Sequence, residues 1–372
     1  MKKLLLAAAV ATVGMSAAQA APTVYGKLNV SLDQVENNGF LKDADTTEVN
    51  SNASRLGVKG EEKLTEKLAA VYQAEWEVST DTGTSVGDNK DSKGTDWKAR
   101  NRFLGLKWAG IGTLKAGYYD SYFKTAAGNA QDIFNDHNHL DITNMMYGED
   151  RLKNAIGFET DKKLLGGVQF NIMAQQGEDS TTDYASKGQE GKRDGFGDSI
   201  STSLTYDNKD LGLALGLAGN FGVEGKYAGA KIAGFSEKYY SDAVRVTGSY
   251  DFGKIGANGL VLGALFQQAE PTDEVTGAEG LKEQSWLVAA TYKVPNTAWA
   301  LKAQYQSAET SADSLADDVT IDQYGLGVDY NLNKQTRFYG VVAQQKLDGV
   351  AIDPLTEDDK KTVFGIGMEY SF

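Results

Sequence analysis

The chain has 372 residues, with 51 acidic and 37 basic side chains, and its formal net charge of −14 argues against nucleic acid as a partner. It contains no cysteine, which excludes a disulfide-stapled scaffold. Mean hydropathy is −0.40, and after the first twenty residues no apolar run is long enough to predict a membrane-spanning helix.

The first twenty residues form a pattern of their own. Two lysines precede a short apolar stretch, which ends in Ala18-Gln19-Ala20. This order is typical of a secretory signal peptide, so we expect residues 1–20 to be removed and residues 21–372 to form the mature chain. A membrane anchor is the alternative, although the stretch is short for a helix that spans a bilayer. Without its first two lysines the chain carries 35 basic and 51 acidic residues, a net charge of about −16.

The mature sequence is typical of β-strands from end to end. In TVYGKLNVSLD, Val24, Leu28 and Val30 fall on one face, and Lys27 and Asn29 fall on the other. Such period-two alternation predicts a strand with one apolar and one polar face. About sixteen segments follow this pattern, at 23–35, 54–61, 66–79, 100–108, 112–120, 153–161, 167–177, 199–208, 210–221, 243–252, 257–269, 284–294, 297–309, 321–331, 335–347 and 361–372.

The connections between these segments alternate in length. The short ones fall near 62–65, 109–111, 162–166, 209, 253–256, 295–296 and 332–334. The long ones fall near 36–53, 80–99, 121–152, 178–198, 222–242, 270–283, 310–320 and 348–360, and they are rich in Asp, Glu, Asn, Gly, Ser and Thr. No linker or shift in composition divides the mature chain, so we expect one domain.

The number of strands favours a closed sheet. An open sheet of this size would leave two unpaired edges, and closure into a barrel removes both. Short connections at one end and long connections at the other are typical of an outer-membrane barrel. The sequence therefore predicts an all-β fold, a transmembrane antiparallel β-barrel of about sixteen strands. A soluble β-sandwich whose tyrosines cap a core is the alternative.

Tyrosines recur on the apolar face just before four of the short connections. An amphipathic ring suits a membrane–water interface, where its apolar body meets lipid and its hydroxyl meets water. We therefore expect an aromatic girdle on the periplasmic side, formed by Tyr206, Tyr250, Tyr292, Tyr330, Trp108, Trp299 and Phe372. Trp76 and Trp286 lie near long connections and are candidates for the opposite girdle.

Several segments resemble the general porins of Gram-negative bacteria. VYGKLNVSLD resembles their first strand, SRLGVKGEEKLTEKLAAVYQAEWEV the second and third, and RNRFLGLKWAGIGTLKAGYYD the fourth and fifth. The terminal YSF resembles the aromatic ending that assembly machinery recognises in such barrels. The resemblance covers the whole mature chain. It implies a trimer of sixteen-stranded barrels, each with a water-filled pore that an inward-folded third long loop narrows.

That loop would carry the acidic side of the pore constriction. Its NAQDIFNDHNHLD resembles the constriction segment of the family, with Asp132 and Asp136 as the matching acids and Asp141, Glu149 and Asp150 nearby. The alternative is a solvated acidic surface loop. The loop lacks the Pro-Glu-Phe-Gly-Gly-Asp run of some enterobacterial relatives, which leaves open how individual acids and bases pair.

The resemblance also implies a basic wall opposite the loop, at Lys27, Arg55, Arg100 and Arg151. Alternation independently turns Lys27, Arg55 and Arg151 away from the apolar face. Either frame of the strand with Arg100 and Arg102 mixes polar and apolar residues. We place both inward, because an arginine that faces lipid at mid-membrane costs roughly 2–4 kcal/mol. Ordinary lumen charges without a role in selectivity are the alternative.

These features predict a general diffusion porin of the Gram-negative outer membrane, which passes ions and small hydrophilic solutes with a weak preference for cations. The expected partners are a homotrimer, outer-membrane lipids and lipopolysaccharide, and the barrel assembly machinery through Phe372. We expect no cofactor. A substrate-selective channel and an adhesin-like barrel or one with a plugged lumen are alternatives. An outer-membrane hydrolase is less favoured, because it needs a histidine beside a nucleophile and only His137 and His139 exist. Their H-x-H spacing suits a metal, but we expect none.

Overall fold

Alternating apolar and polar side chains form strands over most of the chain that the computed structural model describes, which is residues 21–81, 97–134, 136–178 and 193–372. The predicted signal peptide lies outside these residues. The strands are β1 (Thr23–Glu36), β2 (Thr46–Ser51), β3 (Arg55–Lys63), β4 (Leu68–Val78), β5 (Trp97–Trp108), β6 (Gly112–Asp120), β7 (Arg151–Thr160), β8 (Val168–Gln176), β9 (Phe196–Asn208), β10 (Leu213–Lys226), β11 (Lys238–Asp251), β12 (Leu260–Pro271), β13 (Lys282–Lys293), β14 (Trp299–Ser311), β15 (Val319–Asn331), β16 (Thr336–Asp348) and β17 (Lys360–Ser371).

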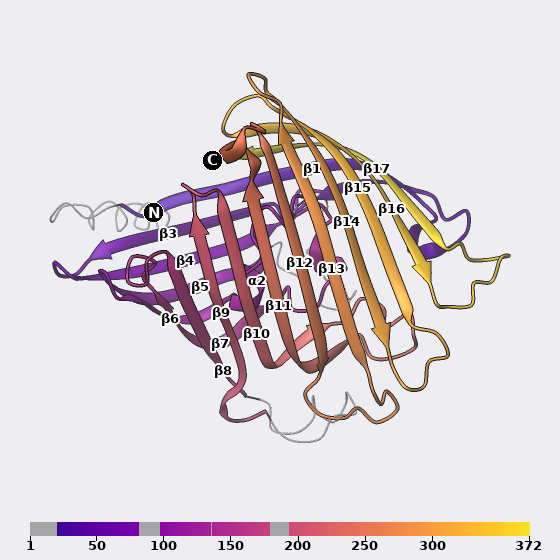
Figure 1. Ribbon diagram of the computed structural model, residues 1–372, viewed down its shortest axis with the longest axis horizontal. Coiled ribbons are helices and arrows are strands. Elements are labelled where there is room, and N and C mark those ends of the chain that lie inside the picture. Colours follow the sequence, from indigo (N-terminus) through magenta and orange to yellow (C-terminus); the bar gives the residue numbers. More distant parts are fainter. Residues whose placement is uncertain (1–20, 82–96, 135, 179–192) are drawn as a thin grey trace, which may run out of the picture.

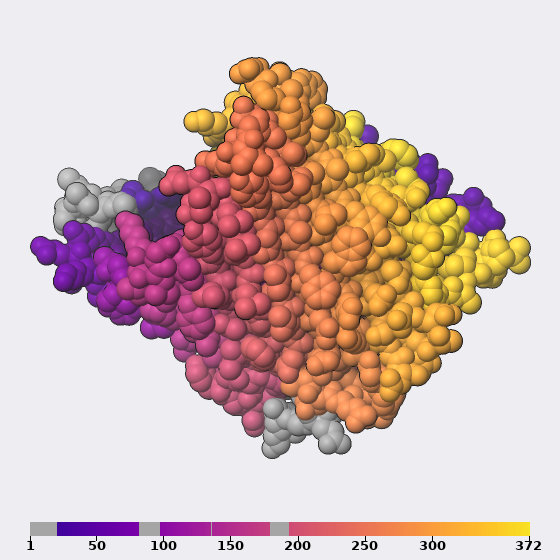
Figure 2. Space-filling view, viewed as in Figure 1, coloured from indigo at the N-terminus to yellow at the C-terminus, as the bar shows by residue number. Residues whose placement is uncertain are grey.

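Each strand pairs antiparallel with its neighbours, and β17 pairs with β1, so the sheet closes into a barrel (Figure 1). The strands β9 to β16 form a continuous wall on the face seen in Figure 2. The helical pieces are short: α2 (Tyr122–Thr125), η1 (Asn38–Phe40), η2 (Ile142–Asn144) and η3 (Phe252–Ile255). Among the described residues, no helix is long and apolar enough to cross a bilayer.

Two short strands, β2 and β3, lie end to end along the same side of β1. Ser51 lies opposite Val30, and Arg55 lies opposite Lys27. Ala53, between them, has a φ of 49° and interrupts the ladder. They therefore count as one interrupted strand, and the predicted sixteen-stranded antiparallel barrel is confirmed.

The first long connection is shorter than predicted, because β2 occupies part of the range 36–53. The segment Thr46–Ser51 has the sequence TTEVNS, with Val49 as its only large apolar side chain. It extends the sheet with polar residues, so apolar alternation gave no signal. The connection 312–318, at the end of the barrel with the predicted long connections, is also short. It has the same length as 161–167, at the opposite end, so the contrast in connection length between the two ends of the barrel is weaker than expected.

The outer face of the barrel is apolar and exposed. Its surface includes Leu104, Ile156, Leu204, Val246 and Leu326, each more than a third exposed. All seven predicted girdle residues share the outward parity of their strands and lie next to short connections or, for Phe372, at the chain end. Trp299 packs on Tyr330 with ring centroids 4.8 Å apart. On the same face, Trp286, Tyr305 and Tyr324 form a row nearer the long connections, with centroids 4.9 and 5.1 Å apart.

The segment 121–150 contributes to an apolar core on the inner side of the wall. The cluster contains Ile133, Phe134, Leu140, Ile142, Met145 and Met146 from the segment, and Leu265, Leu287, Ala289, Ala308, Val319, Ile321, Ala343 and Leu347 from the wall or its edge. Phe134 lies over Gly325 and Gly327, where a Cβ atom would come within 2.8 and 2.6 Å of its ring. This part of the barrel interior is therefore packed, and the larger polar space lies mainly against β3 to β6.

Candidate pore constriction

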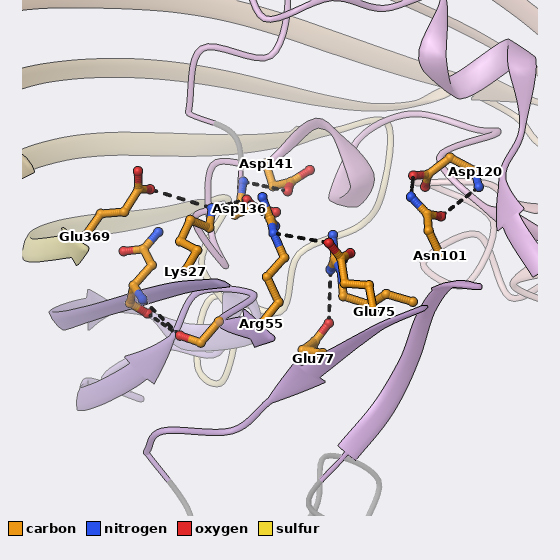
Figure 3. Close-up of polar contacts among 12 residues, drawn as sticks. Lys27, Arg55, Glu75, Glu77, Asn101, Asp120, Asp136, Asp141 and Glu369 are labelled. Atoms are coloured by element: carbon orange, nitrogen blue, oxygen red, sulfur yellow. Dashed lines mark hydrogen bonds and ion pairs between the residues drawn. The ribbon is translucent and has the colours of Figure 1, made fainter. Parts of the chain in front are cut away.

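Asp136 joins the segment 121–150 to the two cations that begin the charged wall. Lys27 and Arg55 are direct cross-strand neighbours on β1 and β3, so their like charges need a counter-ion. Asp136 accepts a hydrogen bond from Lys27 Nζ, and its Oδ2 lies 2.9 Å from Arg55 Nη1 (Figure 3). Burial would raise the pKa of Asp136, but Lys27 and Arg55 outweigh burial and hold that pKa below its usual value. Asp136 is therefore ionised at neutral pH.

The wall beside Arg55 carries its own acids. Glu75 Oε2 lies 3.9 Å from Arg55 Nε, and Glu75 Oε1 lies 2.7 Å from Arg100 Nε. Arg100 Nη1 also lies 3.3 Å from Glu77 Oε2. Neither glutamate was predicted from the sequence. The alternation of β4, LAAVYQAEWEV, places them on its polar face and was the available signal.

The charges continue on the other side of Lys27. Glu369 of β17 lies 3.6 Å from Lys27 and 2.9 Å from Arg337 of β16. Asp329 of β15 then lies 3.0 Å from Arg337 and 2.8 Å from Lys302. Acids and bases therefore alternate around the inner wall, and the arrangement differs from an all-basic wall that faces an acidic loop.

Arg151 forms a second, smaller group with the start of the segment 121–150. Its Nε lies 3.2 Å from Asp120 Oδ1, and Lys124 Nζ lies 3.3 Å from the same oxygen. Asn101 donates a hydrogen bond to Asp120 Oδ2 at 2.7 Å. Arg151 thus faces the interior, as predicted, although Lys153, which has the same parity, lies on the outer face beyond a register shift between β6 and β7.

The inward placement of Arg102 is wrong. Arg102 shares the outer face with Leu104 and stacks on Tyr118, 5.9 Å from the ring centroid. The cause is a β-bulge between β4 and β5, where the register shifts between Ala74 and Trp76. The extra residue lets Arg100 and Asn101 both reach interior carboxylates, and it reverses the parity of the later residues of β5. The bulge also explains why neither frame of this strand looked regular in sequence.

Asp132 lies apart from the basic wall. Its side chain is partly buried, and its Oδ1 is buried and has no hydrogen-bond partner among the described residues. Burial, followed by the nearby charges of Asp141 and Glu149, raises the pKa of Asp132 well above its usual value. The two predicted acids of the loop therefore have opposite environments, and only Asp136 contacts the wall.

Arg245 of β11 anchors both ends of the segment 121–150. Its guanidinium is fully buried and lies 2.6 Å from Glu149 Oε1. It donates hydrogen bonds to the carbonyl oxygens of Phe123 and Tyr147, each at 3.2 Å. Gln267 accepts from Arg245 Nε at 2.9 Å and so fixes the direction of the guanidinium. Arg245 was not predicted as a site residue, although its parity in AVRVTGSYDF places it on the face opposite Val244 and Val246.

Two cavities lie on either side of the segment. The larger, of about 1010 Å³, is lined by Arg55, Arg100, Arg151, Asp132 and Asp136, among others. The smaller, of about 440 Å³, lies toward the short connections and is lined mainly by amides and hydroxyls such as Asn171, Thr205 and Ser249. Thr125, Gly128 and Asn129 line both cavities. The segment 125–129 therefore separates the two spaces at the edge of the charged wall.

The two histidines face different carboxylates. His137 Nε2 lies 3.5 Å from Asp33 Oδ1, and His139 Nε2 lies 3.4 Å from Glu48 Oε2. Burial, then Lys361 and His137, lowers the pKa of His139. Across the described ranges, no group of three or more His, Asp or Glu residues has an arrangement that holds a metal ion.

Comparisons with known proteins agree with this architecture. The major outer membrane protein P.IB of Neisseria gonorrhoeae is 27% identical over 355 residues, which cover 90% of this chain and 91% of that protein. An anion-selective porin from Comamonas acidovorans is 18% identical, with a TM-score of 0.67 over 95% of this chain and 99% of that one. OmpT of Vibrio cholerae, in its trimer form, is 19% identical, with a TM-score of 0.63 over 96% and 100%. The family model for Gram-negative porins matches residues 5–350, and the chain therefore belongs to that family.

Proposed function

We propose that ions and small hydrophilic solutes cross this outer-membrane diffusion channel between the two cavities, past Thr125, Gly128 and Asn129. The observation that carries the proposal is that these three residues line both spaces. The charged wall ends beside them, because Arg55, Arg100 and Arg151 line the larger cavity. Transport is passive and follows the gradient of the solute.

The charged side chains at the constriction are paired with one another, so the electric field there comes from ion pairs and not from unpaired charges. Asp136 lies against Lys27 and Arg55, while Arg100 is held by Glu75 and Glu77. Fixed dipoles of this kind favour polar solutes that align with them over apolar solutes. Our proposal thus assigns Lys27, Arg55, Arg100, Arg151 and Asp136 to the constriction and excludes Arg102.

The lining of the larger cavity favours a weak preference for cations. It contains eight acids (Glu75, Glu77, Asp120, Asp132, Asp136, Asp141, Glu149 and Asp150) and six bases (Arg55, Lys98, Arg100, Lys124, Arg151 and Lys238). The mature chain carries a further acidic excess in its connections. A negative vestibule attracts cations most at low salt, where the Debye length is about 30 Å at 0.01 M against about 10 Å at 0.1 M.

Planar-bilayer recordings test the proposal. We expect ohmic single-channel conductance. Under a salt gradient, the reversal potential should indicate a preference for cations, and this preference should weaken as the salt concentration rises. Arg55→Ala with Arg100→Ala should strengthen the cation preference, since it removes two wall cations. A wild-type channel that prefers anions, or a double variant with an unchanged reversal potential, would refute this assignment.

An enzymatic role has little support from the histidines. A hydrolase needs a histidine within hydrogen-bond reach of a nucleophile. His137 and His139 instead lie near the carboxylates of Asp33 and Glu48, on the segment that we assign to the pore. We propose that the chain has no catalytic activity. A substrate-selective channel would differ in showing saturable flux of one solute class.

Assembly follows the same proposal. We propose that the chain forms a homotrimer after removal of residues 1–20 and that Phe372 presents the aromatic end to the barrel assembly machinery. The outward ring of Phe372 and the trimer form recorded for the structurally similar OmpT support these roles. Lipids, including lipopolysaccharide, would contact the exposed apolar face. Three equal closing steps per insertion event in a bilayer would identify the trimer.

A further inference from the structure

The outer face of the barrel carries an unexpected group of cations. Arg102 of β5 and Lys153 of β7 line an open groove of about 730 Å³, together with Tyr118 and Asn154. Lys98 and Tyr118 line this groove and also the larger cavity inside, so the groove lies at the rim of the wall. Within the described residues, none of the three cations has an ion pair. Their charges are therefore available to an anionic ligand from outside the described chain.

The groove lies where two strands end on the side of the long connections. Tyr118 is two residues before the end of β6, at Asp120, and Lys153 is two residues after the start of β7, at Arg151. Arg102 is the cross-strand partner of Tyr118. The penalty for a cation on the lipid face falls from the middle of the bilayer toward the interface. We therefore expect these cations to lie at the depth of lipid headgroups rather than of acyl chains.

Bulges shape the groove on both of its sides. The register of β4 and β5 shifts beside Arg102, and the register of β6 and β7 shifts between Gly117 and Tyr119. Asn154, in the second bulge, has a φ of 54°, a conformation that asparagine tolerates better than most residues. Each bulge redirects side chains locally, and together they place Arg102 and Lys153 on the same outer groove.

The surface below the groove is apolar. Leu104, Leu114 and Ile156 lie on the outer faces of the same three strands and are 65%, 39% and 46% exposed. A ligand that fits both parts has an anionic head and acyl chains. Phosphate is the anion that best satisfies several cations at once, because it carries up to two charges and accepts paired hydrogen bonds from a guanidinium.

We propose that this groove binds a phosphate-bearing lipid of the outer leaflet, with its phosphate on Arg102 and Lys153 and its chains along Leu104, Leu114 and Ile156. The proposal names a site for the lipid partner in the proposed function and rests on the outer-membrane location of the barrel. It assigns Arg102 a role outside the pore.

The test measures lipid binding to the purified full mature protein in detergent by native mass spectrometry. The probes are a glycolipid with two phosphates, the same lipid without phosphates, and inorganic phosphate alone. The variant is Arg102→Gln with Lys153→Gln. Lys346→Gln is the matched control, because Lys346 is also outward-facing and near a long connection but pairs with its own Asp348 at 2.7 Å.

We expect the wild type and the control to bind the phosphorylated lipid at least about ten-fold more tightly than the double variant. The lipid without phosphates should bind all three proteins equally weakly, and excess inorganic phosphate should not displace the lipid. Equal affinity of wild type and double variant would overturn the proposal, as would displacement by inorganic phosphate.

A neighbouring copy of the chain is the competing occupant of the groove. If the trimer of the double variant dissociates in lipid-free detergent while the wild-type trimer persists, carboxylates of a second subunit fill the groove and the proposal is wrong. Single-channel conductance separates this result from a failure of the channel assignment. The groove lies outside the pore, so the double variant should conduct as the wild type does.

Discussion

Asp136 joins the segment 121–150 to two cations of the inner wall. It balances Lys27 and Arg55, which would otherwise repel each other as cross-strand neighbours. We predict that Asp136→Asn weakens the attachment of the loop by about 1–3 kcal/mol, since hydrogen bonds to charged groups are lost. The reversal potential should shift toward anions, because two wall cations lose their counter-ion.

Bilayer recordings under a salt gradient check this prediction. Asp317→Asn is the control, because Asp317 is exposed in the connection 312–318, away from the inner wall contacts. An equal shift in both variants would mean that total charge, rather than the Asp136 contact, sets the selectivity.

Asp132 should make the channel sensitive to pH. Burial and the neighbouring acids raise the pKa of Asp132, so its carboxyl binds a proton more tightly in the folded protein than in the unfolded chain. Its stabilising contribution is complete below its ordinary pKa of about 3.8 and is lost as pH rises through the raised value. As pH falls through that raised value, one negative charge disappears from the larger cavity, and the cation preference should weaken.

Asp132→Asn separates this residue from the other acids. The variant cannot titrate, so its reversal potential should change less with pH over the same range, while that of Asp136→Asn should keep the wild-type slope. Asp132→Asn should also resist denaturation better than wild type at a pH above the ordinary pKa of the carboxyl, because the raised pKa of folded Asp132 makes ionisation of this carboxyl unfavourable for folding. An identical pH series for wild type and Asp132→Asn would contradict the assignment.

At the scale of elements, the sequence predicted the strands well wherever apolar and polar residues alternate strictly. It failed at β2, which is polar on both faces, and at the bulge of β5, where Arg100 and Arg102 have the same parity but opposite directions. Local pattern cannot reveal a bulge, because the bulge is a relation between two strands.

The candidate site shows the same limit. Lys27, Arg55, Arg151 and Asp136 follow from parity or from family resemblance, and the structure brings the first two together with Asp136. Their pairing with Glu75 and Glu369 requires the register of neighbouring strands. The role of Arg245 cannot be predicted without knowing where the two ends of the segment 121–150 contact the wall. The only sequence signal for the packed part of the interior is that strands such as β12 and β13 have apolar residues on both faces.

The loop as an element depends on Arg245. We predict that Arg245→Gln leaves Glu149 as an unpaired buried carboxylate and frees both ends of the segment 121–150. Breaking a buried pair from one side costs about 3–5 kcal/mol. Single-channel current should become noisier and its mean level should change, while the barrel still inserts. Arg245→Lys keeps the charge but loses the fork that holds Phe123 and Tyr147, so it should give an intermediate phenotype. Unchanged current noise in Arg245→Gln would mean that other contacts hold the loop.

The whole molecule should have one orientation in the membrane. The absence of native cysteine gives a clean background for labelling. Leu355→Cys, at a position 85% exposed in the connection 349–359, should react with an impermeant maleimide on intact cells. Lys334→Cys, in the short connection 332–335, should react only after the outer membrane is opened. The reverse pattern would invert the proposed orientation.

The pairing of β1 with β17 sets an order of events during synthesis. Gly26 and Phe372 exchange main-chain hydrogen bonds of 2.9 and 3.0 Å, so the first strand finds its second neighbour only in the last residues of the chain. Until those residues arrive, one edge of β1 has no partner, and an exposed edge strand invites pairing with other chains. Contacts of such high sequence separation also form slowly. A barrel of this topology is therefore prone to aggregation until its final strand pairs with the first. A chain that lacks the final strand cannot close the barrel in this way.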